Sequence, residues 1–111
     1  METLEGRICS TGYAVAKALV TDSGERPVTD EPYILVTRYA SPDMAIPAFG
    51  AAGIITEEGG VMSHLAVISR ELGIPCIGGC SGATIHFESN MQVELDATNK
   101  LGQAGSARYS P

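Results

Sequence analysis

Residues 59–75 read GGVMSHLAVISRELGIP and carry the clearest secondary-structure signal in the chain. Apolar residues recur there at positions i, i+3 and i+7, and therefore share one helical face: Leu65, Ile68 and Leu72. Gly73 stands where a left-handed cap would end the helix, and Pro75 follows two residues later. The pattern predicts a helix over 63–72 that is entered through the double glycine and carries His64 in its first turn.

Short apolar runs on both sides of this helix predict strands. Residues 33–37 and 53–56 are compact runs bounded by turn-forming residues, which is typical of strands buried on both faces. The other expected strands, the last three of them in small hairpins, lie at 6–9, 13–20, 75–77, 85–87, 92–95 and 101–103. Strands therefore flank the helical middle of the chain at both ends.

A second, shorter helix is expected to begin at Ser41-Pro42-Asp43. Ser41 can cap it, Pro42 suits the first helical position, and Asp43 complements the positive end of the helix dipole. The preceding residues 21–32 have the composition of a loop. Helices set among strands in this way indicate an α/β fold with mixed sheets and a central helix that carries the histidine at its N-terminus.

Length and composition fit one compact domain. The chain has 111 residues, of which 44% are hydrophobic and 18% charged, as in ordinary globular proteins. We assign residues 1–104 to the domain and expect residues 105–111 to form a loose C-terminal tail. Seven basic residues against 13 acidic ones give a net charge of −6, which argues against nucleic acid or an anionic membrane as a partner.

The three cysteines predict a cytoplasmic protein. Cys9, Cys76 and Cys80 cannot all pair within one chain, and their spacing does not resemble a disulfide framework. The sequence shows no secretory signal and no apolar run long enough to span a bilayer. A reducing compartment is the simplest setting for such a chain.

The segment around His64 has the features of an anion site. A turn from strand to helix leaves backbone N–H groups without partners, and the helix dipole adds a positive field. That field disfavours imidazolium, so His64 is expected to keep a lone pair that can act as a nucleophile. Gly59 and Gly60 lack side chains and would let a bulky donor approach, while Ser63 offers a hydroxyl to phosphoryl oxygens. From the residues alone, two interpretations of His64 stay equally open. It accepts a phosphoryl group, or it only occupies the start of a helix without a chemical role.

Residues 59–79 closely resemble the phosphohistidine signature of the PEP-utilising enzymes, the family of pyruvate phosphate dikinase, phosphoenolpyruvate synthase and, more distantly, enzyme I of the sugar phosphotransferase system. The resemblance extends to residues 6–20, 34–44 and 92–102 and so covers most of the chain. It implies a swivelling β/β/α domain. In this family the histidine takes a phosphoryl group from ATP in an ATP-grasp domain and delivers it to pyruvate in a TIM-barrel domain, or works in reverse.

The resemblance assigns roles to individual residues. It implies that His64 is phosphorylated, with Nε2 as the acceptor atom, and that Gly59, Gly60 and Ser63 support the phosphoryl group. Arg70 matches the family's helix arginine, for which a structural role is expected. The resemblance thus implies a phosphotransferase component that is incomplete on its own.

One position departs from the family pattern, because Met62 stands where the family usually has threonine. The change removes a hydroxyl that could bind phosphate and a site that some relatives use for regulatory phosphorylation. The chain also lacks a GxxxxGK[ST] loop and an arginine cluster. We therefore expect no cofactor on this domain, and ATP and Mg²⁺ on partner domains of another chain or a parent protein. Met1 and the short approach to the first strand favour a separate gene product.

Several other residues are set aside. Cys76, Cys80 and His86 lack a fourth ligand and zinc-type spacing, so no metal site is expected and the cysteines should be buried. His86 is expected on the solvent-exposed face of a strand. The two glutamates at 57–58 are expected in a solvated loop, although they could bind Mg²⁺ once a partner docks. The short helix should pack Met44 and Ile46 in the core rather than offer them for docking: both are apolar.

Two other functions remain open from the sequence. One is the carrier domain of a small-molecule phosphotransferase of the antibiotic-phosphorylating type, in which pyruvate is not the acceptor. The other is a scaffold module that has lost its partners. The acceptor is chosen by a domain that this sequence does not contain, so the residues do not discriminate between these functions.

Overall fold

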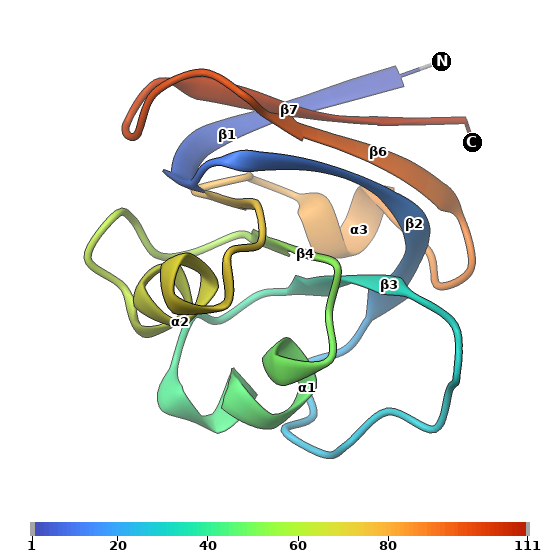
Figure 1. Cartoon of the computed structure of the whole chain (residues 1–111). Coiled ribbons are helices and arrows are strands. Elements are labelled where there is room, and N and C mark those ends of the chain that lie inside the picture. The colour runs from blue at the N-terminus through green and yellow to red at the C-terminus, as the bar shows by residue number, and fades with distance from the viewer. Residues whose placement is uncertain (1, 111) are drawn as a thin grey trace.

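Seven strands close into a barrel in the computed structural model, which describes residues 2–110 (Figure 1). The elements follow one another in the order β1 (Glu2–Ser10), β2 (Gly12–Val20), β3 (Tyr33–Thr37), a 3₁₀ turn η1 (Pro42–Met44), α1 (Ala45–Phe49), β4 (Gly53–Thr56), α2 (His64–Leu72), β5 (Cys76–Gly78), α3 (Ala83–His86), β6 (Gln92–Ala97) and β7 (Ala104–Tyr109). The helices α1 and α2 lie on the side of the barrel away from β6 and β7 (Figure 1).

The sheet is mixed, as expected, but it is a single closed sheet. Around the barrel the strand order is β1-β5-β4-β3-β2-β6-β7, with β7 returning to β1. The pairs β2–β3, β3–β4 and β4–β5 are parallel, and the remaining pairs are antiparallel. The expectation of separate mixed sheets was wrong because β1 is long enough to pair with β7 along its first part and with β5 along its last part. Closure removes the exposed edges that two sheets would leave.

Two hydrophobic clusters explain why the parallel strands are apolar throughout. Alternate residues such as Ile34 and Val36 point into the barrel, while Leu35 and Ile54 point outward beneath α1 and α2. Every residue of β3 and β4 is buried, as the compact apolar runs predicted. The helix α2 is therefore anchored on the outer face of the parallel strands.

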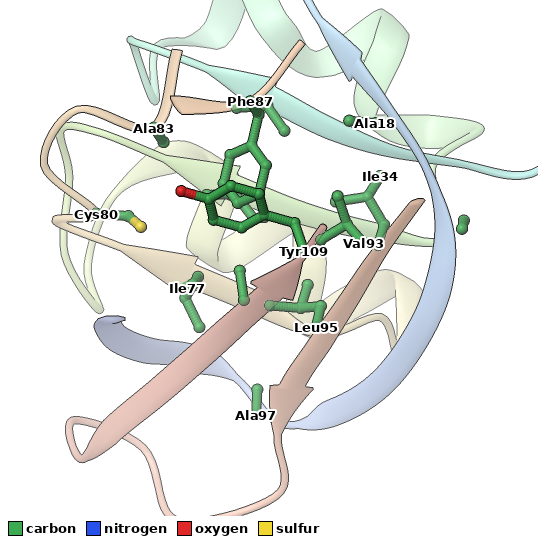
Figure 2. Close-up of a cluster of buried hydrophobic side chains, with 14 of the residues drawn as sticks. Ala18, Ile34, Ile77, Cys80, Ala83, Phe87, Val93, Leu95, Ala97 and Tyr109 are labelled. Atoms are coloured by element: carbon green, nitrogen blue, oxygen red, sulfur yellow. The ribbon is translucent and has the colours of Figure 1, made fainter. Parts of the chain in front are cut away.

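The segment expected as a strand at 85–87 instead belongs to α3. Phe87, directly after this helix, enters the barrel and packs edge-on against Tyr109, with ring centroids 4.6 Å apart (Figure 2). One turn of helix is what carries the chain across the barrel end and places Phe87 inside. The apolar residue Ile85 that suggested a strand is 80% exposed.

The C-terminal expectations were also wrong. No strand forms at 101–103, where the described chain makes a turn, and residues 104–109 form β7 instead of a loose tail. Pro111, the last residue of the expected tail, lies outside the described residues. β7 pairs with β1 on one side and with β6 on the other. Its inward residues are Gly105, Ala107 and Tyr109, and two of these are too small to give a strand signal in the sequence.

The short helical segment begins where Ser41-Pro42-Asp43 predicted, although the Ser41 side chain makes no capping hydrogen bond. Met44 is buried as expected, whereas Ile46 is 55% exposed, which corrects its assignment to the core. Pro47 lies within α1, and its carbonyl accepts a hydrogen bond from the Tyr33 hydroxyl at 2.6 Å. Within residues 2–110 no helix has the length and apolar character needed to cross a membrane.

Candidate active site

His64 is the first residue of α2, and it follows a loop that leaves the carboxyl end of β4. The His64 side chain is exposed, and neither ring nitrogen has a hydrogen-bond partner among residues 2–110. The imidazole is thus exposed and free of hydrogen bonds to the described part of the chain.

The helix α2 starts at His64, one residue inside the start expected from the sequence, and is capped by Ser63. Ser63 Oγ accepts a hydrogen bond from the Ala66 backbone N–H at 3.3 Å. Because an accepting hydroxyl still has its own proton, Ser63 keeps a donor for another group. The N–H groups of His64 and Leu65 have no acceptor within the described chain. The helix start therefore presents unused donors beside the histidine.

The two glycines before the histidine differ in what they do. Gly59 has a φ of +100°, and a Cβ there would lie 2.7 Å from the Ala40 Cβ, so the fold requires glycine. A Cβ at Gly60 would meet nothing within 4 Å among the described residues. Gly60 therefore leaves open space in front of the loop rather than relieving a clash.

A shallow cleft of about 490 Å³ lies beside His64. It runs between the start of the short helical segment, at Pro42 and Ala45, and the exposed side of α2, at Val67. Met62 borders the cleft and is 87% exposed. The side chain at position 62, where the resemblance led us to expect threonine, thus borders the same cleft as His64.

Arg70 holds the histidine loop against the barrel, a contact that the sequence did not reveal. Its Nη1 donates to the Cys9 carbonyl oxygen at 2.7 Å and to the Val61 carbonyl oxygen at 2.8 Å. One guanidinium nitrogen therefore joins β1, the loop before His64 and the last turn of α2. The expected structural role of Arg70 is supported, and the contact specifies which two segments it connects.

Glu57 does not lie free in a solvated loop. Its Oε2 accepts from the Thr84 backbone N–H at 2.9 Å and from the Thr84 hydroxyl. These hydrogen bonds, together with the nearby Arg38 guanidinium, lower the pKa of the Glu57 carboxyl below its ordinary value of 4.5. Glu57 thereby ties the start of the histidine loop to α3, whereas its neighbour Glu58 is exposed.

The residues considered for a metal make contacts of other kinds. All three cysteines are buried and free. A hydrogen bond between the Cys9 and Cys76 thiols lowers the pKa of Cys9 and raises that of Cys76, and burial raises the pKa of Cys80 to about 11. His86 is exposed on α3 rather than on a strand, and its Nδ1 lies 3.3 Å from the Tyr109 hydroxyl. Residues 2–110 contain no cluster of three or more side chains suited to binding a metal ion.

Comparison with known proteins identifies the family. Residues 29–100 match the model of the mobile domain of PEP-utilising enzymes. The chain is 41% identical over 103 residues to the phosphoenolpyruvate synthase of Pyrococcus furiosus, a match that covers 92% of this chain and 13% of that protein. It is 48% identical over 73 residues to a probable phosphoenolpyruvate synthase of Methanothermobacter thermautotrophicus, covering 66% of this chain and 11% of that protein. The chain therefore belongs to the family of PEP-utilising enzyme mobile domains, which confirms the resemblance seen at 59–79.

The fold is shared more widely than the family. Aconitase X of Thermococcus kodakaraensis, in its holo form, matches over the full length of both chains with a TM-score of 0.70 and 17% sequence identity. A likeness at that identity concerns the fold alone, because one fold hosts many activities. The chain spans about an eighth of the length of the phosphoenolpyruvate synthases that it matches, as the 13% and 11% shares indicate.

Proposed function

We propose that this chain is a phosphoryl carrier in which Nε2 of His64 accepts a phosphoryl group. The supporting observation is the exposed imidazole, without a hydrogen-bond partner among residues 2–110, at the capped start of α2. A phosphohistidine formed there would have its oxygens near the donors of the helix start and the Ser63 hydroxyl. The open space at Gly60 gives the donor its path of approach.

The chemistry follows from the ring nitrogen. The lone pair on Nε2 forms the N–P bond while the bond from phosphorus to the donor's leaving oxygen breaks, and the leaving group keeps that bonding pair. The Nδ1 proton of His64 remains on the ring during transfer and then passes to solvent. The unused N–H groups and the dipole of α2 stabilise negative charge on the phosphoryl oxygens. Because a phosphoramidate retains high transfer potential, the same steps can run in reverse toward an acceptor.

The carrier is proposed to shuttle between two partners. Membership of the mobile-domain family and the match to phosphoenolpyruvate synthases favour an ATP-grasp domain as one partner and a PEP/pyruvate TIM-barrel domain as the other. ATP and Mg²⁺ are assigned to those domains, since Glu57, the acidic residue nearest the loop start, is already engaged by Thr84. The domain would swivel between the two, either within a parent protein or as a separate subunit.

A direct test uses phosphoramidate, a small phosphoryl donor that needs no partner domain. We expect intact-mass spectrometry to show one added phosphoryl group on the wild-type chain and on His86→Ala, but none on His64→Ala. The adduct should be labile in acid and stable in base. If His64→Ala gains as much phosphate as the wild type, the assignment of His64 is wrong.

The relay is tested with labelled PEP and the PEP-binding barrel domain of a phosphoenolpyruvate synthase. Label should move to the chain and return to PEP when pyruvate is added. A chain that accepts label from an ATP-dependent partner but passes it to another small molecule would be the small-molecule phosphotransferase carrier. A chain that takes label from neither partner would be the scaffold module.

A further inference from the structure

The guanidinium of Arg70 acts on the loop that precedes the histidine, not on the ring itself. Its Nη1 donates to the Val61 carbonyl oxygen at 2.8 Å and to the Cys9 carbonyl oxygen at 2.7 Å. Hydrogen bonds from a charged donor are shorter and stronger than neutral ones. These two contacts therefore fix the Val61 carbonyl relative to β1 more firmly than a loop contact between neutral groups would.

The Cys9 carbonyl on β1 can accept this hydrogen bond because the strand is irregular there. The pairing of β1 with β5 joins Ile8 to Ile77 and Ser10 to Cys76, so that Cys9 has no partner of its own in the ladder. Such a bulge leaves one residue's backbone groups free and re-aims them. Arg70 takes up the carbonyl that the bulge leaves free at Cys9. The bulge thus gives Arg70 a fixed point on the barrel wall.

The orientation of the Val61 carbonyl determines where the next N–H points. The structure contains no cis peptide bond among the described residues, so in the Val61–Met62 peptide the N–H is directed opposite to the carbonyl. The carbonyl faces Arg70, and the Met62 N–H therefore faces away from it. That N–H has no acceptor among residues 2–110, whereas the neighbouring Ser63 N–H is used by the Gly60 carbonyl at 3.0 Å.

We propose that Arg70 is a positioning residue: by holding the Val61 carbonyl against the barrel, it aims the free Met62 N–H at the phosphoryl group carried by His64. The inference rests on the proposed carrier function. A backbone N–H is present whichever side chain stands at residue 62. The loop therefore keeps this donor although methionine replaces the hydroxyl residue that is usual in the family.

The test uses ¹⁵N-labelled protein and phosphoramidate. In the wild type, phosphorylation of His64 should shift the Met62 amide resonance strongly downfield, as a new hydrogen bond to phosphate would. In Arg70→Met, the shift should be lost and phosphorylation should be slower by at least about tenfold, less than the roughly hundredfold loss on deleting a preorganised donor, because the N–H is misaimed and not removed. Arg70→Lys, which keeps a charged donor, should recover at least part of both effects.

Two control variants separate positioning from general damage. Arg108→Met removes a guanidinium that pairs with Glu94 at 3.2 Å on β6, and it should behave as the wild type does. Val93→Ala lowers stability from within the barrel, and it should leave the Met62 shift intact. The proposal for Arg70 is overturned if Arg70→Met keeps the wild-type rate and amide shift, or if Val93→Ala loses the shift as well. If the wild-type chain takes no phosphate on His64, the carrier function itself fails.

Discussion

The residues around His64 show how similar side chains in a sequence can have different physical roles. Gly59 and Gly60 are adjacent and look interchangeable, yet only Gly59 has a positive φ and a neighbour that a side chain would strike. The fold requires glycine at position 59, whereas position 60 faces open space, which the proposed function uses as the donor's path to the ring. The sequence suggested access for both, because neither backbone conformation nor the position of Ala40 is visible in a motif.

Alanine substitutions should separate these two roles. Gly59→Ala should lower the free energy of unfolding by about 1–3 kcal/mol, because it forces a side chain into a strained backbone conformation against Ala40. Gly60→Ala should change it by less than about 0.5 kcal/mol. Urea unfolding measures both. Equal losses for the two variants would contradict the distinction.

A second residue-scale prediction concerns Cys80, whose thiol has a pKa raised to about 11 by burial. Because only the thiolate reacts, alkylation of Cys80 by iodoacetamide at pH 8 should be at least about a hundredfold slower than alkylation of free cysteine. In urea, Cys9, Cys76 and Cys80 should all react readily. Rapid labelling of Cys80 in the folded protein would mean that the barrel end under α3 is open.

At the scale of single elements, the sequence predicted those whose signal is local. The helix after the double glycine, its left-handed cap at Gly73 and the buried strands at 33–37 and 53–56 all appear in the structure. It missed α3, because a four-residue helix gives too short a pattern to distinguish from a strand. The contacts of Arg70 were also missed, because they join segments that are 61 and 9 residues away in the chain.

The tie between Glu57 and α3 should make stability depend on pH. Since the pKa of Glu57 is held below 4.5, its ionised form stabilises the fold above that value, and this contribution is lost as the pH falls through the folded-state pKa. Glu57→Gln should therefore be less stable than the wild type by about 1 kcal/mol at pH 7. The difference should shrink as the pH is lowered below 4.5.

Urea unfolding at a series of pH values measures this effect. Glu58→Gln is the matched control, because it removes the same charge from an exposed neighbour that has no such contact. A Glu57→Gln deficit that stays constant across the acid range would show that the hydrogen bonds to Thr84 do not depend on ionisation of the carboxyl.

At the scale of the whole molecule, barrel closure depends on β7, the strand for which the sequence analysis expected a loose tail. β7 joins β1 to β6, yet its inward positions include Gly105 and Ala107, which pack because the barrel is narrow there. A Cβ on Gly105 would lie 2.7 Å from a methyl group of Ile77. Only the assembled barrel reveals that small residues are required, so composition along the chain could not predict closure.

Removing residues 105–111 should therefore abolish cooperative unfolding, since it opens the barrel and exposes an edge on both β1 and β6. Removing only 110–111 leaves β7 intact and should have little effect. Circular dichroism during thermal unfolding distinguishes the two. Cooperative melting at the wild-type temperature after removal of 105–111 would restore the interpretation of this segment as a loose tail.

The central claim is that one exposed ring nitrogen at the start of α2 carries phosphorus. Long-range ¹H–¹⁵N spectra of the imidazoles, recorded before and after treatment with phosphoramidate, observe that atom directly. The account predicts that Nε2 of His64 acquires a coupling to ³¹P while both nitrogens of His86 keep their original resonances. An unchanged His64 ring, under conditions in which free histidine becomes phosphorylated, would contradict it.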